Sequence, residues 1–324
     1  MKTPILSAHN LVKHFNAGGF GAARKVVRAV DDVSFELARG ETLGVVGESG
    51  CGKSTTARLL VQLLTPDSGG VRYDGKVVGP DMPLRAFRSK VQMVFQDSFA
   101  SLNPRMTMID AVAFGPSVHG VPKAEARRKA QGLLERVGLD PARFGGRYAH
   151  ELSGGQRQRV NIARALAFDP QVIVLDEAVS ALDKSVEAQV LNLLMDLRRE
   201  RGLTYVFISH DLNVVRHISD RVMVMYLGEV AEIGPAERLY SEPRHPYTEA
   251  LLAAMPSLDP DRRTLEAPLA GDPPNPIDPP PGCRFHTRCA SAFGPCASKV
   301  PAPHSLGGGH VAACHLNSSK EHAA

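Results

Sequence analysis

The eight residues GESGCGKS, at positions 47–54, limit what this chain can fold into more than any other stretch of its sequence. They match the pattern G-x-x-x-x-G-K-[ST], between an apolar run at residues 42–46 that predicts a strand and a helical pattern at residues 55–64. Glycines let the backbone curl so that its N–H groups face phosphate oxygens, and the start of the following helix adds partial positive charge. The stretch predicts a phosphate loop, in which Lys53 reaches the β- and γ-phosphates and the Ser54 hydroxyl binds Mg²⁺. A chance glycine-rich turn is the alternative.

Two acidic residues follow an apolar run further along the chain. In VIVLDE, at residues 172–177, a predicted strand leads to Asp176, a candidate Mg²⁺ partner through water, and Glu177, a candidate general base. Paired acids after a strand are common at protein surfaces, but together with a phosphate loop they indicate a nucleotide hydrolase. About 120 residues separate Lys53 from Asp176, far more than one crossover helix needs, so we expect an inserted subdomain.

The remaining apolar pattern predicts an α/β fold with a parallel sheet, because short β-branched runs alternate with a helical pattern. Predicted strands lie at residues 8–15, 42–46, 172–175, 205–208 and 222–226, and predicted amphipathic helices at residues 122–137 and 186–197.

Charge and hydropathy exclude several classes of protein. With 38 basic and 34 acidic residues mixed along the chain, the formal net charge of +4 gives neither a nucleic-acid-binding stripe nor an acidic tail. The start of the sequence lacks the apolar segment of a secretory signal, and no apolar run approaches the roughly 18 residues of a membrane-spanning helix. We therefore expect a cytosolic chain that spans no membrane by itself.

The composition changes near Gly234. Most of the 24 prolines follow it, including DPPNPIDPPPG at residues 272–282, which predicts a linker. The linker leads to four of the five cysteines, which are Cys283, Cys289, Cys296 and Cys314. Four thiolates suit an iron–sulfur cluster or a tetrahedral zinc site, and a reducing cytosol favours metal over disulfides. The spacing matches neither zinc ribbons nor ferredoxins, so the metal stays open, with unliganded thiols as the alternative.

A further phosphate-related pattern is ELSGGQRQRV, at residues 151–160. Ser153 and Gln156 form an S-x-x-Q capping box, which predicts a helix start, and Gly154 and Gly155 leave its backbone open to an anion. One ATP held by residues 47–54 leaves no obvious use for a second anion site in the same chain. We infer that this site faces the nucleotide of another subunit.

These motifs, in this order, resemble the nucleotide-binding subunit of an ABC transporter. The resemblance covers about residues 5–235 and rests on the phosphate loop, LSGGQ, VIVLDE with SALD at residues 180–183, Gln96 in MVFQDSFASLNPRM and His210 in FISHDL. ASLNPRM, EPRHPYTEALL and the proline- and cysteine-rich tail resemble the oligopeptide/dipeptide (peptide/nickel) importer subfamily, so that the resemblance extends over nearly the whole chain.

The resemblance implies a P-loop NTPase core of the RecA-like type. The core, with an antiparallel β subdomain, would comprise residues 1–96 and 157–235. A helical signature subdomain would be inserted at residues 97–156, and a C-terminal extension with the cysteine cluster would follow at residues 236–324. Two such subunits would close head-to-tail around two ATP molecules, each lying between the phosphate loop of one chain and the signature of the other.

The resemblance also assigns roles to residues. ATP would be bound by Phe15, stacked on adenine, and by Gly47, Glu48, Ser49, Gly50, Cys51, Gly52, Lys53, Ser54 and Thr55. The partner's nucleotide would be contacted by Ser153, Gly154, Gly155, Gln156 and Asp183. Catalysis would rest on Glu177, His210 and Gln96, and Mg²⁺ would be bound through Ser54, Gln96 and Asp176. The alternative for Phe15 is a core position. Ala178 and Val179 stand where the family commonly has Pro-Thr, and Ser98 replaces a frequent proline, but the acids remain and we expect hydrolysis to survive.

The implied function is ATP hydrolysis that energises import of dipeptides or oligopeptides, with ATP, Mg²⁺ and a [4Fe–4S] cluster, or Zn²⁺ in its place, as cofactors. The implied partners are two membrane permease subunits, gripped by the loop at residues 97–106, a paralogous ATPase subunit and, indirectly, a solute-binding protein. The chain would lie on the cytoplasmic face of a bacterial inner membrane. Nickel complexes, opines and oligosaccharides are alternative solutes. Two alternatives belong to other classes of protein. One is a soluble ABC ATPase acting on nucleic acid or ribosomes, which the single cassette and the absence of a basic arm oppose. The other is a redox protein with an auxiliary ATPase, which the absence of a flavin or dinucleotide fingerprint opposes.

Overall fold

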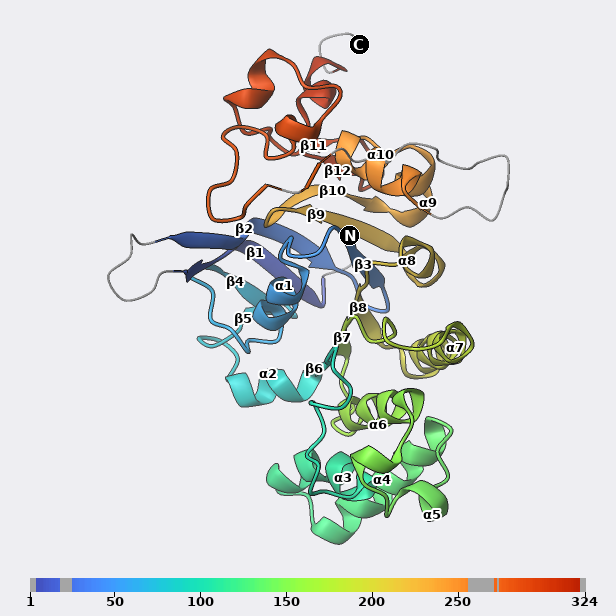
Figure 1. Cartoon of the computed structure of the whole chain (residues 1–324). Helices are drawn as coiled ribbons and strands as arrows, with labels where there is room; N and C mark the ends of the chain where they lie inside the picture. Colours follow the sequence, from blue (N-terminus) through green and yellow to red (C-terminus); the bar gives the residue numbers. More distant parts are fainter. Residues whose placement is uncertain (1–3, 18–24, 256–270, 273, 321–324) are drawn as a thin grey trace. The chain divides into compact units, whose positions relative to one another are not determined.

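The computed structural model describes residues 4–17, 25–255, 271–272 and 274–320 (Figure 1). Its contacts divide the chain into two units, which are described separately. The first unit consists of Met1–Lys2, Ala38–Glu41 and Lys76–Ser209, and the second of Thr3–Leu37, Thr42–Gly75 and His210–Ala324. Residues 256–270 and Pro273, which include part of the predicted proline-rich linker, lie outside the described residues.

The second unit begins with an antiparallel sheet of β1 (Leu6–Asn16), β2 (Val26–Leu37) and β4 (Ser68–Tyr73), in which β1 pairs with both neighbours. This confirms the expected antiparallel β subdomain. The strand predicted at residues 8–15 is part of β1, whereas β2 was not predicted. Its sequence VVRAVDDVSFEL sets charged residues among the apolar ones, which hides the strand period.

A second group of strands in this unit carries the phosphate loop and the C-terminal tail. The buried strand β3 (Thr42–Val46) pairs in parallel with β9 (Arg221–Tyr226), and β10 (Glu229–Pro235) pairs antiparallel with β9. The short strands β12 (Val311–Ala312) and β11 (His304–Ser305) continue the order as β11-β12-β10-β9-β3. The tail therefore adds strands to the sheet that holds the phosphate loop.

Short helices complete the second unit. They are α1 (Lys53–Leu60), α8 (Leu212–Ile218), α9 (Ala236–Ser241), α10 (Pro246–Ala253) and the 3-10 turns η3 (His286–Arg288), η4 (Gly294–Ala297) and η5 (His315–Lys320). Helix α1 ends earlier than the predicted residue 64. Gln62 adopts a left-handed φ of 57°, and the Leu63 N–H donates to the Arg58 carbonyl at 2.8 Å, which closes the helix end.

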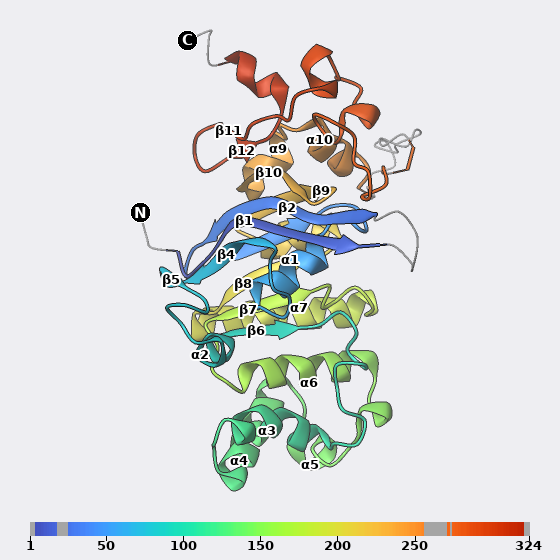
Figure 2. The ribbon, with the colours of Figure 1, turned by 90° about the vertical axis from the view of Figure 1, so that its left-hand side faces the viewer.

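The first unit combines three parallel strands with a group of helices (Figure 2). Strands β6 (Val91–Val94), β7 (Val172–Asp176) and β8 (Thr204–Ile208) lie in the order β8-β7-β6. The helices are α2 (Leu84–Lys90), α3 (Met108–Val118), α4 (Lys123–Arg136), α5 (Pro141–Phe144), α6 (Gly154–Leu166) and α7 (Lys184–Arg201). The unit also contains the short strand β5 (Lys76–Val77) and the turn η1 (Ala149–Glu151). Helices α3, α4 and α6 contact one another. The parallel strands and the inserted helical subdomain expected from the sequence are confirmed.

The pattern of burial explains these elements. Every residue of β7 and β8 is buried, as expected for parallel strands covered on both faces, and their continuous apolar runs made them predictable. None of the helices in the described ranges combines the length and apolar character that crossing a membrane requires.

Candidate functional site

The phosphate loop follows β3 in the second unit and is closed by its own lysine. The Lys53 ammonium donates to the carbonyl oxygens of Gly47 at 2.7 Å and Glu48 at 2.9 Å. Lys53 is buried although it is charged, being 5 % exposed. A buried ammonium is costly unless carbonyl or phosphate oxygens satisfy it, so the loop presents a cation suited to phosphate.

The loop's glycines are required by close backbone contacts. Gly47 has φ 147°, and a Cβ added there would lie 2.2 Å from the carbonyl oxygen of Met225. Gly52 has φ 106°, and a Cβ added there would lie 2.2 Å from the carbonyl oxygen of Ala29. The loop therefore nests between β9 and β2, and any larger residue at either position would displace it. Cys51 is buried within the loop, and burial raises the pKa of its thiol, so it is neutral there.

Asp176 and Glu177 lie at the end of β7 in the first unit. Asp176 is 2 % exposed and is the last residue of the strand. Glu177 adopts a left-handed φ of 47°, held by a hydrogen bond from its N–H to the Ile208 carbonyl at 3.0 Å and by the Ser180 hydroxyl, which donates to the Glu177 carbonyl at 3.0 Å. Non-glycine residues in this conformation are uncommon and concentrate at functional sites.

Gln96 lies directly against Glu177. Its side-chain amide donates to the Glu177 carboxylate at 2.9 Å. The two residues are 81 positions apart, and the family resemblance implied a role for each without predicting this contact. The adjacent Ala178 and Val179, which depart from the usual family residues, are buried in the core.

The signature helix α6 begins as predicted. The Ser153 hydroxyl accepts from the Gln156 N–H at 3.3 Å, and the Gln156 side chain accepts from the Ser153 N–H at 3.0 Å, which confirms the capping box. The two glycines differ in their surroundings. A Cβ on Gly155 would lie 2.3 Å from Val186 Cγ1 on α7, whereas one on Gly154 would meet only Leu182, at 3.7 Å. Gly155 thus has a packing role that the sequence did not predict.

Three polar residues of α6 hold the loop that follows Gln96. Asn161 donates to the Ser98 carbonyl at 3.0 Å, Arg164 donates to the Ser101 carbonyl, and the Arg157 guanidinium stacks over the Phe99 ring at 5.4 Å. Burial lowers the pKa of Arg164. The sequence analysis missed these residues, although their spacing at i, i+4 and i+7 places them on one face of the helix.

The other predicted site residues lie at exposed or partly exposed positions. Phe15 on β1 is 37 % exposed with Lys13 over its ring at 5.8 Å, so it is not a core residue. His210 is exposed and precedes Asp211, which caps α8. Asp183 is exposed at the start of α7. Phe15, the phosphate loop and His210 belong to the second unit, whereas Gln96, Asp176, Glu177, Asp183 and the signature belong to the first.

The four cysteines of the tail are free thiols. Burial, together with smaller contributions from Cys296, Cys314 and Cys289, raises the pKa of Cys283 to about 11, so the four lie within electrostatic range of one another. Nevertheless, in the described part of the chain no three His, Cys, Asp or Glu side chains are placed to hold a metal ion. The geometry therefore does not support the predicted iron–sulfur cluster.

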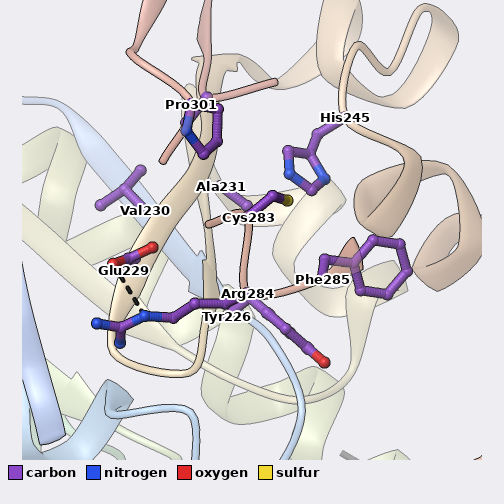
Figure 3. A pocket seen from close by; sticks show the side chains of 10 residues that line it. Tyr226, Glu229, Val230, Ala231, His245, Cys283, Arg284, Phe285 and Pro301 are labelled. Atoms are coloured by element: carbon purple, nitrogen blue, oxygen red, sulfur yellow. Dashed lines mark ion pairs between the residues drawn. The ribbon is translucent and has the colours of Figure 1, made fainter. Parts of the chain in front are cut away.

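A small cavity of about 30 Å³ lies where the tail meets β9 and β10 (Figure 3). Arg284 points toward Glu229, and Nε of Arg284 lies 2.9 Å from the Glu229 carboxylate. Burial raises the pKa of Glu229 to about 7 in spite of this partner. On the other side lies His245, whose pKa burial lowers to about 4, so that this imidazole is neutral.

Comparison with known proteins places these features in a family. Residues 30–180 match the ABC transporter family, and residues 231–296 match the family described as oligopeptide/dipeptide transporter, C-terminal region. Among solved structures, the ATP-binding cassette MJ0796, in a dimeric post-hydrolysis state bound to ADP and phosphate, is 31 % identical with a TM-score of 0.63, over 71 % of this chain and 98 % of that one. CbiO1 from Clostridium perfringens is 28 % identical with a TM-score of 0.62, over 74 % of this chain and 92 % of that one.

Curated relatives match almost end to end. A probable peptide ABC transporter ATP-binding protein of Sinorhizobium fredii is 50 % identical over 98 % of this chain and 91 % of its own length. The dipeptide transport ATP-binding protein DppF of Escherichia coli is 48 % identical over 96 % of this chain and 94 % of its own length. The chain is therefore a member of the ABC ATPase family, in the group of transporter ATP-binding subunits that carries the oligopeptide/dipeptide C-terminal region.

Proposed function

We propose that this chain hydrolyses ATP to energise the import of dipeptides or oligopeptides, as a peripheral subunit on the cytoplasmic face of a bacterial inner membrane. The match of the C-terminal region supports the peptide class, as do relatives about half identical over nearly the whole chain and named for peptide transport. Nickel complexes, opines and oligosaccharides stay alternative solutes, because the ATPase subunit does not contact the solute.

ATP binding would use the phosphate loop, with Lys53 moving its hydrogen bonds from the loop carbonyls to phosphate oxygens. Phe15 would stack on adenine, which its partly exposed ring allows. Mg²⁺ prefers hard oxygen ligands, and the Ser54 hydroxyl, the Gln96 amide oxygen and the Asp176 carboxylate are donors of this kind. When bound, the ion would balance charge on the phosphates.

Hydrolysis would proceed by in-line attack of water on the γ-phosphate. Glu177 would orient the water and accept its proton, and His210 would help to hold the water and the γ-phosphate in line. The observation that carries this proposal is the Gln96–Glu177 hydrogen bond of 2.9 Å, because it ties the carboxylate to the loop expected to contact the permease. A change in that loop would move the catalytic carboxylate.

The signature would act on the nucleotide of a second ATPase subunit. Ser153 is exposed at the N-cap of α6, where an anion gains from free N–H groups and from the helix dipole. Gly154 leaves this approach open, while Gly155 contributes its backbone and Asp183 reaches across the dimer. We propose a paralogous chain as the usual partner, so that the working pair is a heterodimer.

The permease subunits would dock on the helical part of the first unit. A hollow of about 410 Å³ there is lined by Arg105, Met106, Thr107, Asp110, Ala113, Phe114, Ser117, Lys123, Arg127 and Tyr148. The exposed rings of Phe114 and Tyr148 flank it, and such rings anchor interfaces. Because residues 97–106 continue from Gln96 into this hollow, a permease helix seated there would act on Glu177.

Binding of a thiophilic metal by the tail thiols would require the tail to rearrange from the geometry described above. Four thiols within electrostatic range are chemically suited to a [4Fe–4S] cluster or to Zn²⁺, although no three side chains in the described part of the tail are placed to hold one ion. A metal would supply a cross-link between the segments that bear Cys283, Cys289, Cys296 and Cys314. The metal content of the chain tests this point separately from its ATPase activity.

The transport proposal is tested by reconstituting the chain with its paralogue and permeases in proteoliposomes, together with the solute-binding protein. We expect ATPase activity to rise when the binding protein carries a dipeptide or oligopeptide, and the labelled peptide to move from the side of the binding protein to the side that bears the ATPase. Stimulation by nickel complexes, opines or glycans but not by peptides would reject the peptide class. Stimulation by DNA or RNA, without any effect of the permeases, would reject the transport role.

A further inference from the structure

The C-terminal extension binds Glu48 of the phosphate loop through both its backbone and its side chain. The Glu48 N–H donates to the Tyr247 hydroxyl at 2.9 Å, and the Glu48 carboxylate accepts from both terminal nitrogens of Arg288, at 2.7 and 3.0 Å. Tyr247 lies on α10 and Arg288 ends η3, so both belong to the extension, while Glu48 is the second residue of the loop. One residue of the nucleotide site thus has both its backbone and its side chain fixed by the tail.

The groups that hold Glu48 are themselves rigidly placed. Tyr247 is fully buried, and its ring packs against Tyr226 at 4.5 Å and Phe285 at 5.3 Å between centroids. The Arg288 side chain is only 6 % exposed and also donates to the Gly271 carbonyl at 3.0 Å. A bidentate arginine–carboxylate pair with little exposure is geometrically specific, unlike a surface ion pair.

A further contact joins the tail to the same loop. Arg284 donates to the carbonyl of Leu227, in the turn between β9 and β10. The next residue, Gly228, donates its N–H to the Cys51 carbonyl of the phosphate loop at 2.9 Å. Arg284 also pairs with Glu229 (Figure 3) and with Asp31, and these two ion pairs fix its position. The tail therefore contacts the start of the loop directly and its middle indirectly, through the turn between β9 and β10.

Arg288 also neutralises the negative charge of Glu48. A carboxylate on a loop that binds a triphosphate repels its ligand, because like charges at close range disfavour one another. Arg288 cancels that charge, and the hydrogen bonds that its guanidinium donates to the Glu48 carboxylate raise the pKa of the guanidinium, which stays charged. Arg288 is thus placed to compensate an acidic residue of a loop that is expected to bind a polyphosphate.

We propose that Arg288 and Tyr247 are positioning residues of the nucleotide site: together they hold the phosphate loop through Glu48, and Arg288 neutralises the carboxylate beside the triphosphate. The C-terminal extension is thereby a component of the ATP site and sets its affinity. This inference rests on the proposal that residues 47–54 bind ATP.

The test measures the equilibrium Kd of ATP for the purified full-length chain by calorimetry, with Tm recorded without nucleotide. Arg288→Gln leaves the Glu48 carboxylate uncompensated, and its Kd should rise about tenfold, which corresponds to about 1.4 kcal/mol. Tyr247→Phe keeps the ring packing but removes the acceptor of the Glu48 N–H, and its Kd should rise about threefold or more. Arg288→Lys keeps the charge and should lose less affinity than Arg288→Gln.

A double variant separates neutralisation from simple anchoring. In Glu48→Gln combined with Arg288→Gln no lone carboxylate faces the triphosphate, so the Kd should return most of the way to that of the unmodified chain. Arg238→Gln is the matched control, because Arg238 bonds the tail carbonyls of Gly307 and Leu306 without touching the phosphate loop. Its Kd should be unchanged.

Three results would overturn the inference. Arg288→Gln could bind ATP as tightly as the unmodified chain, the double variant could bind no better than Arg288→Gln, or Arg238→Gln could weaken binding equally, which would make the effect a general loosening of the tail. If the unmodified chain itself fails to bind ATP, the proposed function fails instead, so the two failures are distinguishable.

Discussion

At the scale of single residues, Glu177 shows how the fold prepares a catalytic group. Its left-handed backbone is stabilised by the Ile208 carbonyl and by Ser180, and its carboxylate is oriented by Gln96. Such a conformation costs on the order of 1–3 kcal/mol and persists only where the surroundings determine it. The residue types and the strand that precedes them were predictable, but the backbone strain and the Gln96 contact were not, since neither is encoded in local spacing.

Glu177→Gln should bind ATP but hydrolyse it about 10²–10⁴-fold more slowly, because the attacking water loses its general base while the shape of the site is kept. Steady-state ATPase activity, measured with the partner subunits present, checks this, and ATP binding is followed in parallel. Turnover near that of the unmodified protein would remove Glu177 from the proposed role.

The raised pKa of Glu229 predicts that the stability of the chain depends on pH. Its pKa is raised to about 7 in the folded chain, so between its usual range and pH 7 the folded state holds a proton that the unfolded state has lost. The contribution of Glu229 to the free energy of unfolding therefore falls as the pH rises from about 4.5 to 7. Relative to Glu229→Gln, the unmodified chain should lose on the order of 2 kcal/mol of unfolding free energy between pH 5 and 8.

Urea unfolding at pH 5, 6.5 and 8 measures this difference, with the exposed carboxylate variant Glu237→Gln as control. The control should follow the unmodified chain at all three values. A constant difference between Glu229→Gln and the unmodified chain across this range would contradict the assignment.

At the scale of elements, helix α6 combines three tasks. Its start presents the signature, its Arg157, Asn161 and Arg164 hold the loop after Gln96, and its second glycine lets α7 pack closely. The sequence predicted the helix start because a capping box is local. It did not predict the packing role of Gly155, because that role depends on Val186, which lies in another helix.

Gly155→Ala should therefore destabilise the chain by about 1–3 kcal/mol, since its Cβ would overlap Val186. Gly154→Ala, whose Cβ would meet only Leu182 at ordinary contact distance, is the matched control and should change stability little. Thermal unfolding compares the two. Adding Val186→Ala to Gly155→Ala should recover part of the loss, and equal destabilisation by both alanines would argue against the packing account.

Other elements show where sequence patterns carry information and where they do not. Strands β7 and β8 were predicted to within one residue, because a buried parallel strand is a continuous apolar run. Helix α3 was missed, since Gly115 and Pro116 interrupt its pattern, and α10 was missed because it begins with Pro246 in a proline-rich stretch. Proline at the first turn of a helix is well tolerated, and His245 caps this one.

At the scale of the whole molecule, contacts over long sequence separations connect the C-terminal extension to the nucleotide site. Arg288 and Glu48 are 240 positions apart, and the short strands of the tail join β10. The sequence indicated a linker and a cysteine-bearing tail, but residues so far apart give no local pattern from which their contact follows. The extension is thus part of the ATPase unit in which the phosphate loop lies.

The cysteines of the tail lead to a prediction about the metal content of the chain. A chain purified anaerobically should contain iron and absorb visible light, or contain zinc, and a variant with Cys283→Ser and Cys296→Ser should lose the metal, because two of four ligands are gone. Elemental analysis of both proteins measures this. A colourless preparation without iron or zinc would reject the metal site and leave the ATPase proposal untouched.

The central claim is that ATP lies between the phosphate loop of one chain and the signature of another. It is tested most directly by attaching a photo-crosslinker at Ser153→Cys in the assembled complex and identifying the joined peptides by mass spectrometry. With a non-hydrolysable ATP analogue, we expect a product that joins this position to the phosphate loop of a different polypeptide, and little of it without nucleotide. Products confined to one polypeptide, or unchanged by nucleotide, would contradict the account.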